Sequence, residues 1–254
     1  MNRPLLVIIR ADHGNLKPSW DPGAHADIDA DGVRETWEQE AHQVLGYAAQ
    51  GWLSLIRDHG AAALAAGVDA PTIQHLRPAW LSSGLAVVRY GLGPVPVEVR
   101  EADGTWPPGY KTAHHYINKW ASIWAAGTGG ASIVLCCHAN AGGGRHGIVG
   151  ADKRSARGQR YMEPMSASLE QLDEVTSVTR LLFYDDRNST TKPWLYRSMS
   201  VVGGAYAGPD RHAGLILEPG FLDAADHRML WTEDGHRRIG QAIARGCVAI
   251  SQET

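Results

Sequence analysis

Cysteine is scarce in this chain of 254 residues, and several other absences narrow the class of protein. The three cysteines, Cys136, Cys137 and Cys247, have no regular spacing, which argues against a disulfide scaffold. No apolar run reaches the roughly 20 residues that a membrane helix needs, so we expect no membrane span. There is no long run of lysine or arginine and the formal net charge is -3, so we expect no nucleic-acid partner.

Familiar catalytic signatures are missing as well. The sequence contains no His-Glu-x-x-His helix and no Cys-x-x-Cys pair, so two common zinc patterns are absent. It also lacks the Gly-x-Ser-x-Gly elbow of serine hydrolases. The glycine-rich residues 141–150 are not followed by Gly-Lys-Ser or Gly-Lys-Thr, so they do not form a phosphate loop. Any catalytic site must therefore be assembled from residues dispersed along the chain.

The residues that are present predict a folded α/β protein. Hydrophobic residues make up 44% of the chain, which is enough for a sizeable core. Apolar runs predict strands that alternate with amphipathic or alanine-rich segments that predict helices. The expected strands are 5–10, 85–90, 131–137 and 214–217, and the expected helices are 36–57, 61–66, 114–126, 166–183 and 235–250. This alternation predicts a single domain, residues 1–254, with a twisted, mostly parallel central sheet flanked by helices.

Three of the expected strands lead directly into residues that can bind or activate a metal. His13 follows the strand 5–10, His138 follows 131–137, and Glu218 follows 214–217. In an open α/β sheet, residues just past the carboxyl ends of the strands gather in one crevice. Two imidazoles and a carboxylate in that crevice predict a metal site with a catalytic base.

The same segments resemble the zinc-dependent N-acetylmuramoyl-L-alanine amidases. Asp12-His13-Gly14, followed by Asp21-Pro22-Gly23-Ala24, is similar to that family's opening Asp-x-Gly-His-Gly-Gly and Asp-Pro-Gly-Ala. Cys137-His138-Ala139-Asn140-Ala141 resembles the family's Ser-Ile-His-Ala-Asn-Ala, and Glu218-Pro219-Gly220-Phe221-Leu222-Asp223 resembles Glu-x-Gly-Phe-Leu-Ser-Asn. The motifs occur in the family's order and span nearly the whole chain. The opening departs from the family, and residues 60–110 form a longer segment than we expect for it.

The resemblance implies that His13 and His138 bind zinc and that Glu218 is the catalytic carboxylate. It also implies a third ligand, a glutamate at the start of the first helix that faces the sheet. Glu35, Glu38 and Glu40 compete for this role. At about 100° per residue, Glu38 lies nearest the apolar stripe through Ala41, Leu45 and Trp52, so we choose Glu38, with Glu40 next.

The implied reaction is cleavage of the peptidoglycan amide between N-acetylmuramic acid and L-alanine. Zinc would activate water and Glu218 would act as the general base. Two other interpretations stay open: a zinc amidohydrolase or peptidase acting on a soluble peptide or small amide, and a catalytically inactive wall-binding module. We see no export signal, which is typical of a phage-type lysin released to the wall or of a cytosolic enzyme. The sequence does not predict an oligomeric state.

Overall fold

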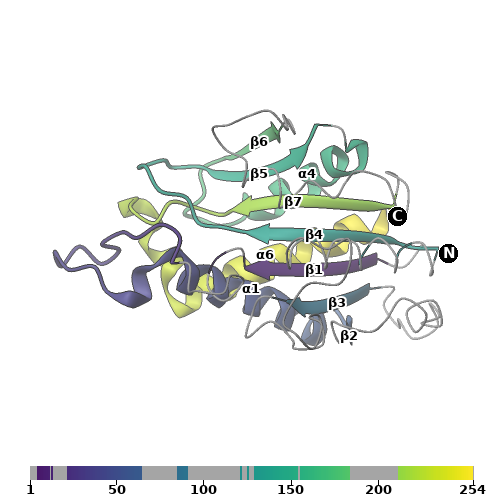
Figure 1. Ribbon diagram of the computed structural model, residues 1–254, viewed down its shortest axis with the longest axis horizontal. Helices are drawn as coiled ribbons and strands as arrows, with labels where there is room; N and C mark the ends of the chain where they lie inside the picture. Colours follow the sequence, from purple (N-terminus) through teal and green to yellow (C-terminus); the bar gives the residue numbers. More distant parts are fainter. Residues whose placement is uncertain are drawn as a thin grey trace, which may run out of the picture.

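A seven-stranded sheet in the order β2-β3-β1-β4-β7-β5-β6 forms the centre of the structure (Figure 1). The computed structural model describes residues 5–11, 13, 22–64, 85–90, 121, 125, 129–153, 155–183 and 211–253. Neighbouring strands are parallel except β5 and β7, which are antiparallel. The α/β class and the mostly parallel sheet are therefore confirmed. The strands are β1 (Leu5–Ala11), β2 (Ala62–Leu64), β3 (Leu85–Tyr90), β4 (Ala131–Cys137), β5 (Gly147–Asp152), β6 (Val178–Phe183) and β7 (His212–Glu218).

The central strands are buried on both faces, as is typical of a parallel sheet that is covered on both sides. Every residue of β1 and β4 is buried. Alternate side chains of β1, such as Val7 and Ile9, enter a hydrophobic core that they share with the helices. The register sets Leu5 opposite Ala131 and Ala11 opposite Cys137, so these two strands end at the same level.

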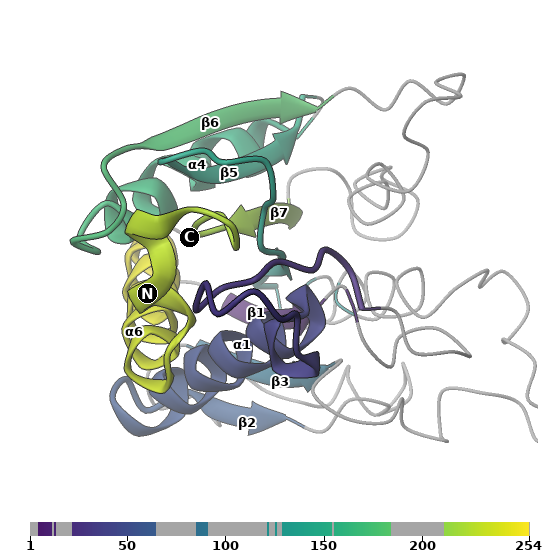
Figure 2. The same cartoon turned by 90° about the vertical axis from the view of Figure 1, so that its left-hand side faces the viewer.

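Three helices pack on one face of the sheet: α1 (Glu40–Arg57), α4 (Ala156–Leu169) and α6 (Glu233–Gln252) (Figure 2). Helix α6 contacts both α1 and α4. Hydroxyl side chains cap two of the helices, because Ser155 Oγ accepts from Gly158 N at 2.9 Å and Thr232 Oγ1 accepts from Gly235 N at 3.1 Å. Short 3-10 helices, η1 (Thr36–Glu38) and η5 (Ala225–Trp231), precede α1 and α6. Among the described residues, no helix is both long enough and apolar enough to span a membrane.

All four expected strands, and the helix expected at 235–250, are confirmed, but several helical predictions are wrong. The helix expected at 166–183 is the end of α4 followed by strand β6, because a short apolar run fits both periods. The alanine-rich segment 61–66 contains strand β2, whose pairing with β3 overrides its helix propensity. Part of the glycine-rich segment 141–150 belongs to β5. Of the helix expected at 114–126 only Ala121 and Ala125 are described, and both are helical, while residues 91–109 lie outside the described residues.

Candidate functional site

Strands β1, β4 and β7 are neighbours in the sheet and end at the same edge. His13 lies two residues past β1, His138 directly follows β4, and Glu218 is the last residue of β7. Figure 1 shows the three strands pointing toward one end of the molecule. The sheet therefore places these predicted site residues along one edge, as the sequence analysis expected.

The Glu40 carboxylate lies between the two histidines. Its Oε1 atom is 3.3 Å from His13 Nε2 and 3.3 Å from His138 Nδ1. The two imidazole rings meet edge to face, with their centroids 5.1 Å apart. One ligand atom from each of the three side chains lies within 4.8 Å of the others, an arrangement that can hold a metal ion. Glu40 is the first residue of α1, so the helix start delivers this carboxylate to the edge of the sheet.

Backbone groups fix the orientation of the Glu40 carboxylate. Ala139 N donates to Oε1 at 2.9 Å, and Ala24 N donates to Oε2 at 2.8 Å. Glu40 is only 5% exposed, and burial alone would raise the pKa of its carboxyl group. The adjacent His13 and His138 outweigh burial, so the pKa of Glu40 is lowered and the group is a carboxylate at neutral pH.

The predicted position of Glu38 beside the histidines is not found. Its buried carboxylate accepts hydrogen bonds from the backbone N–H groups of Ile28, Asp29 and Glu35 instead. The phase argument assumed one continuous helix from Thr36. The structure has a 3-10 turn that ends at Glu38, and Gln39 is extended with ψ of 141°. This break resets the helical phase, so Glu40, the second choice, faces the sheet.

Residues 22–24 of the Asp-Pro-Gly-Ala motif contact the start of α1 through backbone hydrogen bonds. Ala41 N donates to Pro22 O at 3.0 Å, and Glu40 N donates to Ala24 O at 2.8 Å. Gly23 lies between these contacts with φ of +67°, a conformation that favours glycine. A Cβ atom on Gly23 would lie 2.6 Å from Glu40 Oε2 and 2.9 Å from His13 Cγ. A side chain at this position would therefore collide with the site itself.

The motifs that follow β4 and β7 are joined by backbone hydrogen bonds. His138 N donates to Leu217 O at 2.8 Å, Asn140 N donates to Gly220 O at 3.0 Å, and Leu222 N donates to Asn140 O at 2.8 Å. These bonds extend the parallel pairing beyond the strand ends, so the segments that carry His138 and Glu218 form one unit. Side chains from η5 hold the far end of this unit. Phe221 N donates to His227 Nδ1 at 2.9 Å, and Trp231 Nε1 donates to Phe221 O at 3.1 Å.

Tyr47 is a site residue that the sequence analysis missed. Its hydroxyl group donates to the backbone carbonyl of His138 at 2.7 Å. Burial, together with the Glu40 and Glu218 carboxylates, raises the pKa of Tyr47, so its hydroxyl group stays protonated and remains a donor. Tyr47 lies two helical turns after Glu40 on the same face of α1. That spacing was the available signal, but it becomes informative only when Glu40 is known to face the sheet.

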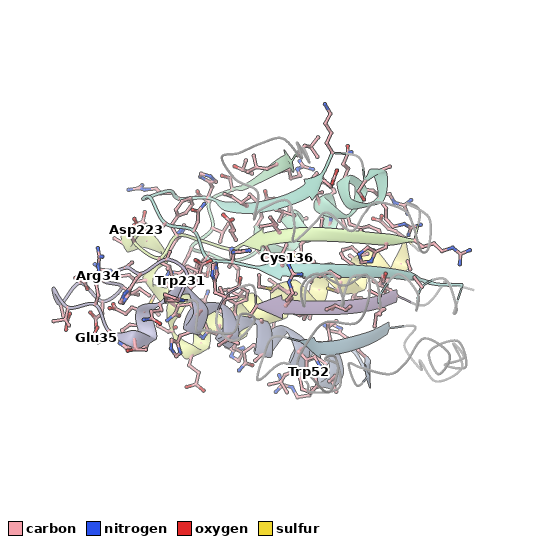
Figure 3. The ribbon with its side chains drawn as sticks, viewed as in Figure 1. Arg34, Glu35, Trp52, Cys136, Asp223 and Trp231 are labelled. Atoms are coloured by element: carbon pink, nitrogen blue, oxygen red, sulfur yellow. The ribbon has the colours of Figure 1, made fainter. Side chains whose placement is uncertain are left out.

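The Asp223 carboxylate also binds the loop after β4 through backbone hydrogen bonds. Its carboxylate accepts from Gly142 N at 2.9 Å and from Gly143 N at 3.0 Å. The glycine-rich loop is thus attached to the segment that follows Glu218. Figure 3 shows Asp223 near the end of the molecule toward which β4 and β7 point.

Comparison with solved structures shows a fold shared with N-acetylmuramoyl-L-alanine amidases. The chain is similar to N-acetylmuramoyl-L-alanine amidase AmiC2 of Nostoc punctiforme, with a TM-score of 0.54, 14% identity, and coverage of 98% of this chain and 97% of that one. It is also similar to the CwlD amidase of Clostridioides difficile, solved in complex with the GerS lipoprotein, with a TM-score of 0.55, 14% identity and coverage of 100% of both chains. A third similar structure is the N-acetylmuramoyl-L-alanine amidase of Clostridium difficile 630, with a TM-score of 0.55, 12% identity, and coverage of 98% of this chain and 97% of that one. No family model and no curated protein matches the sequence.

Proposed function

We propose that this chain is a zinc-dependent N-acetylmuramoyl-L-alanine amidase that acts on peptidoglycan. The observation that carries the proposal is the meeting of His13, Glu40 and His138 at the carboxyl edge of a sheet with the fold of such amidases. The sequence motifs around His13, His138 and Glu218 support the same assignment.

The donor set fits zinc. Catalytic zinc sites use three protein ligands, drawn from histidine nitrogen and carboxylate oxygen among others, and keep a position open. His13 Nε2, Glu40 Oε1 and His138 Nδ1 supply two nitrogens and one oxygen. Glu40 also receives two backbone hydrogen bonds, which orient the ligand as outer-shell contacts do in metal sites. Zinc held there would supply Lewis-acid chemistry to the scissile carbonyl and the attacking water.

The remaining chemistry falls to residues of the chain. The Glu218 carboxylate accepts the proton of the attacking water and delivers it to the departing amine nitrogen. Its position depends on the joined segments after β4 and β7, because Leu217 O accepts from His138 N. Tyr47 holds the other side of this junction through the carbonyl of His138. These contacts keep the proton acceptor and the imidazole at a fixed separation.

The test measures metal content and bond cleavage separately. We expect about one zinc per chain by elemental analysis, and release of new L-alanine amino termini from purified peptidoglycan. Glu218→Gln should keep the zinc and lose activity by about a hundred- to ten-thousandfold, because the amide cannot accept the proton. Glu233→Gln, an exposed change at the start of α6, is the matched control and should behave as wild type.

Two results would contradict the proposal. A zinc-loaded protein that cleaves soluble peptides but releases no L-alanine termini from peptidoglycan or muropeptides would be a different amidohydrolase. A protein that binds peptidoglycan and zinc but cleaves neither kind of substrate would be an inactive binding module. Near wild-type turnover of Glu218→Gln would assign Glu218 a structural role.

A further inference from the structure

Residues 27–38 carry a second metal-binding pattern that is independent of the two histidines. Their sequence reads Asp-Ile-Asp-Ala-Asp-Gly-Val-Arg-Glu-Thr-Trp-Glu. The loop of EF-hand calcium sites has acidic ligands at positions 1, 3 and 5, glycine at 6, a backbone carbonyl ligand at 7, a polar group at 9 and glutamate at 12. Asp27, Asp29, Asp31, Glu35 and Glu38 occupy positions 1, 3, 5, 9 and 12 of this pattern. Gly32 occupies position 6 and has φ of +90°.

The segment is folded so that these carboxylates converge. Ligand oxygens of Asp27, Asp29 and Glu38 lie within 4.8 Å of one another, and so do those of Asp29, Asp31 and Glu35. Gly32 N donates to the Asp27 carboxylate at 2.9 Å, which closes the turn. Figure 3 shows Glu35 and Arg34 at the end of the molecule toward which the strands point, on the loop that precedes α1.

Within the part of the chain that the structure describes, no protein cation neutralises these converging carboxylates. Among the described residues, no lysine or arginine forms an ion pair with any of these carboxylates. Glu38 is fully buried, and its oxygens accept hydrogen bonds from three backbone N–H groups. The side chain of Glu35 is partly exposed, but its Oε2 atom is shielded from solvent and has no hydrogen-bond partner among the described residues. A buried carboxylate oxygen without a partner is costly unless a cation binds it.

We propose that residues 27–38 bind one calcium ion through the carboxylates of Asp27, Asp29, Asp31, Glu35 and Glu38 and the carbonyl of Val33. Calcium fits better than magnesium because it takes six to eight oxygen ligands in flexible geometry, whereas magnesium keeps several waters. The all-oxygen donor set also separates this site from the zinc site, which contains two imidazoles.

The calcium loop borders the candidate zinc site. Gln39, the residue after the loop, pairs with His25 in an isolated β-bridge, and Glu40 follows it. His25 Nε2 lies 2.8 Å from the carbonyl of Glu35, which ties the loop to the segment that contains Gly23 and Ala24. Calcium at this loop therefore stabilises the start of α1 and the backbone contact between Ala24 and Glu40. We expect calcium to raise the thermal unfolding temperature of the full chain, because it binds the folded state only.

The experiment titrates calcium chloride into the zinc-reconstituted full chain by calorimetry, with terbium chloride as a luminescent probe. We expect one calcium per chain, and weaker response to magnesium. Asp27→Asn and Asp29→Asn should each weaken calcium binding at least about tenfold, because each removes a ligand charge. Asp173→Asn, an exposed change in the turn after α4, is the control and should leave binding unchanged.

Terbium emission sensitised by Trp37 reports where the ion binds. Trp37 lies at position 11 of the loop, directly before the Glu38 ligand, so we expect it to transfer excitation to a terbium ion held there. Trp37→Phe should lower sensitised terbium emission strongly while calcium affinity by calorimetry stays the same. The proposal is overturned if no calcium binds at millimolar concentration, if neither aspartate variant weakens binding, or if Trp37→Phe leaves the emission unchanged.

Discussion

Replacement of Gly23 by alanine tests whether the segment before α1 shapes the metal site. The structure implies that this substitution lowers the free energy of unfolding in two ways. Alanine at φ of +67° is strained by roughly 1–2 kcal/mol, less the gain of about 0.4–1 kcal/mol from a more restricted unfolded chain. In addition, the new Cβ atom would lie 2.6 Å from Glu40 Oε2 and 2.9 Å from His13 Cγ, so both side chains must move. Overpacking of this kind costs about 1–3 kcal/mol.

Gly129 separates the two costs. It has φ of +70°, and a Cβ atom there would meet no atom of the described residues within 4 Å, so we expect Gly129→Ala to carry the backbone strain alone. We expect Gly129→Ala to lower the unfolding free energy by about 1 kcal/mol, and Gly23→Ala by about 2–4 kcal/mol. At about 2–4 °C per kcal/mol for a chain of this size, thermal denaturation of the metal-free proteins resolves the difference.

Metal affinity gives the decisive comparison. Displacement of Glu40 and His13 should weaken zinc binding by about tenfold or more in Gly23→Ala, which corresponds to about 1.4 kcal/mol. Gly129→Ala should bind zinc as wild type does. Competition with a chromogenic chelator measures both constants. Equal zinc affinity in the two variants would refute the reasoning that Gly23 is required by the site rather than by its turn alone.

Three further predictions concern the same site and the sheet. Glu40→Gln should lose about 1–3 kcal/mol of stability, because one of two buried backbone donors loses its acceptor. It should also weaken zinc binding in chelator competition, whereas Glu38→Gln should not, and the opposite ranking would return the ligand role to Glu38. Tyr47→Phe removes the hydroxyl donor to His138 O and should cost about 1 kcal/mol in urea unfolding, and an unchanged midpoint would show that this bond contributes nothing. Burial lowers the pKa of His212 from 6.5 to about 4, so the unfolded state binds the proton more readily. Stability is therefore full above about pH 6.5 and falls by up to about 3 kcal/mol toward pH 4, a loss that should shrink in His212→Asn if urea unfolding is repeated across that range.

The sequence predicted the centre of the sheet because its strands are unambiguous. Residues 5–10 and 131–137 are largely apolar runs that are too short for helices of typical length, and each is followed within three residues by a histidine. The positions of His13 and His138 at one sheet edge followed from this pattern. The elements at the far side of the sheet were harder to predict, because the leucines and valines of 169–182 fit a helical repeat although they span a helix end, a turn and a strand.

The third residue of the candidate metal site, Glu40, could not be predicted from the hydrophobic periodicity of the sequence. A helical wheel drawn from Thr36 favours Glu38, and nothing in the apolar pattern marks the extended conformation of Gln39. The break has a local cause that the sequence does contain. Glu38 is the last residue of the acidic loop and is held by backbone N–H groups of that loop, so it cannot also face the sheet. Recognition of the loop pattern would have removed Glu35 and Glu38 from the choice and left Glu40.

The order of the strands has a consequence for synthesis of the chain. β7 comes last among the strands of the described residues, yet it lies between β4 and β5 in the sheet. A nascent chain that stops before residue 212 therefore leaves an edge of the apolar strand β4 open, and β5 and β6 have no strand that joins them to β1 and β4. Open apolar edges favour wrong pairing with other chains. Helix α6, which packs against both α1 and α4, leaves the ribosome later still. Completion of the sheet must therefore wait until β7 has been synthesised.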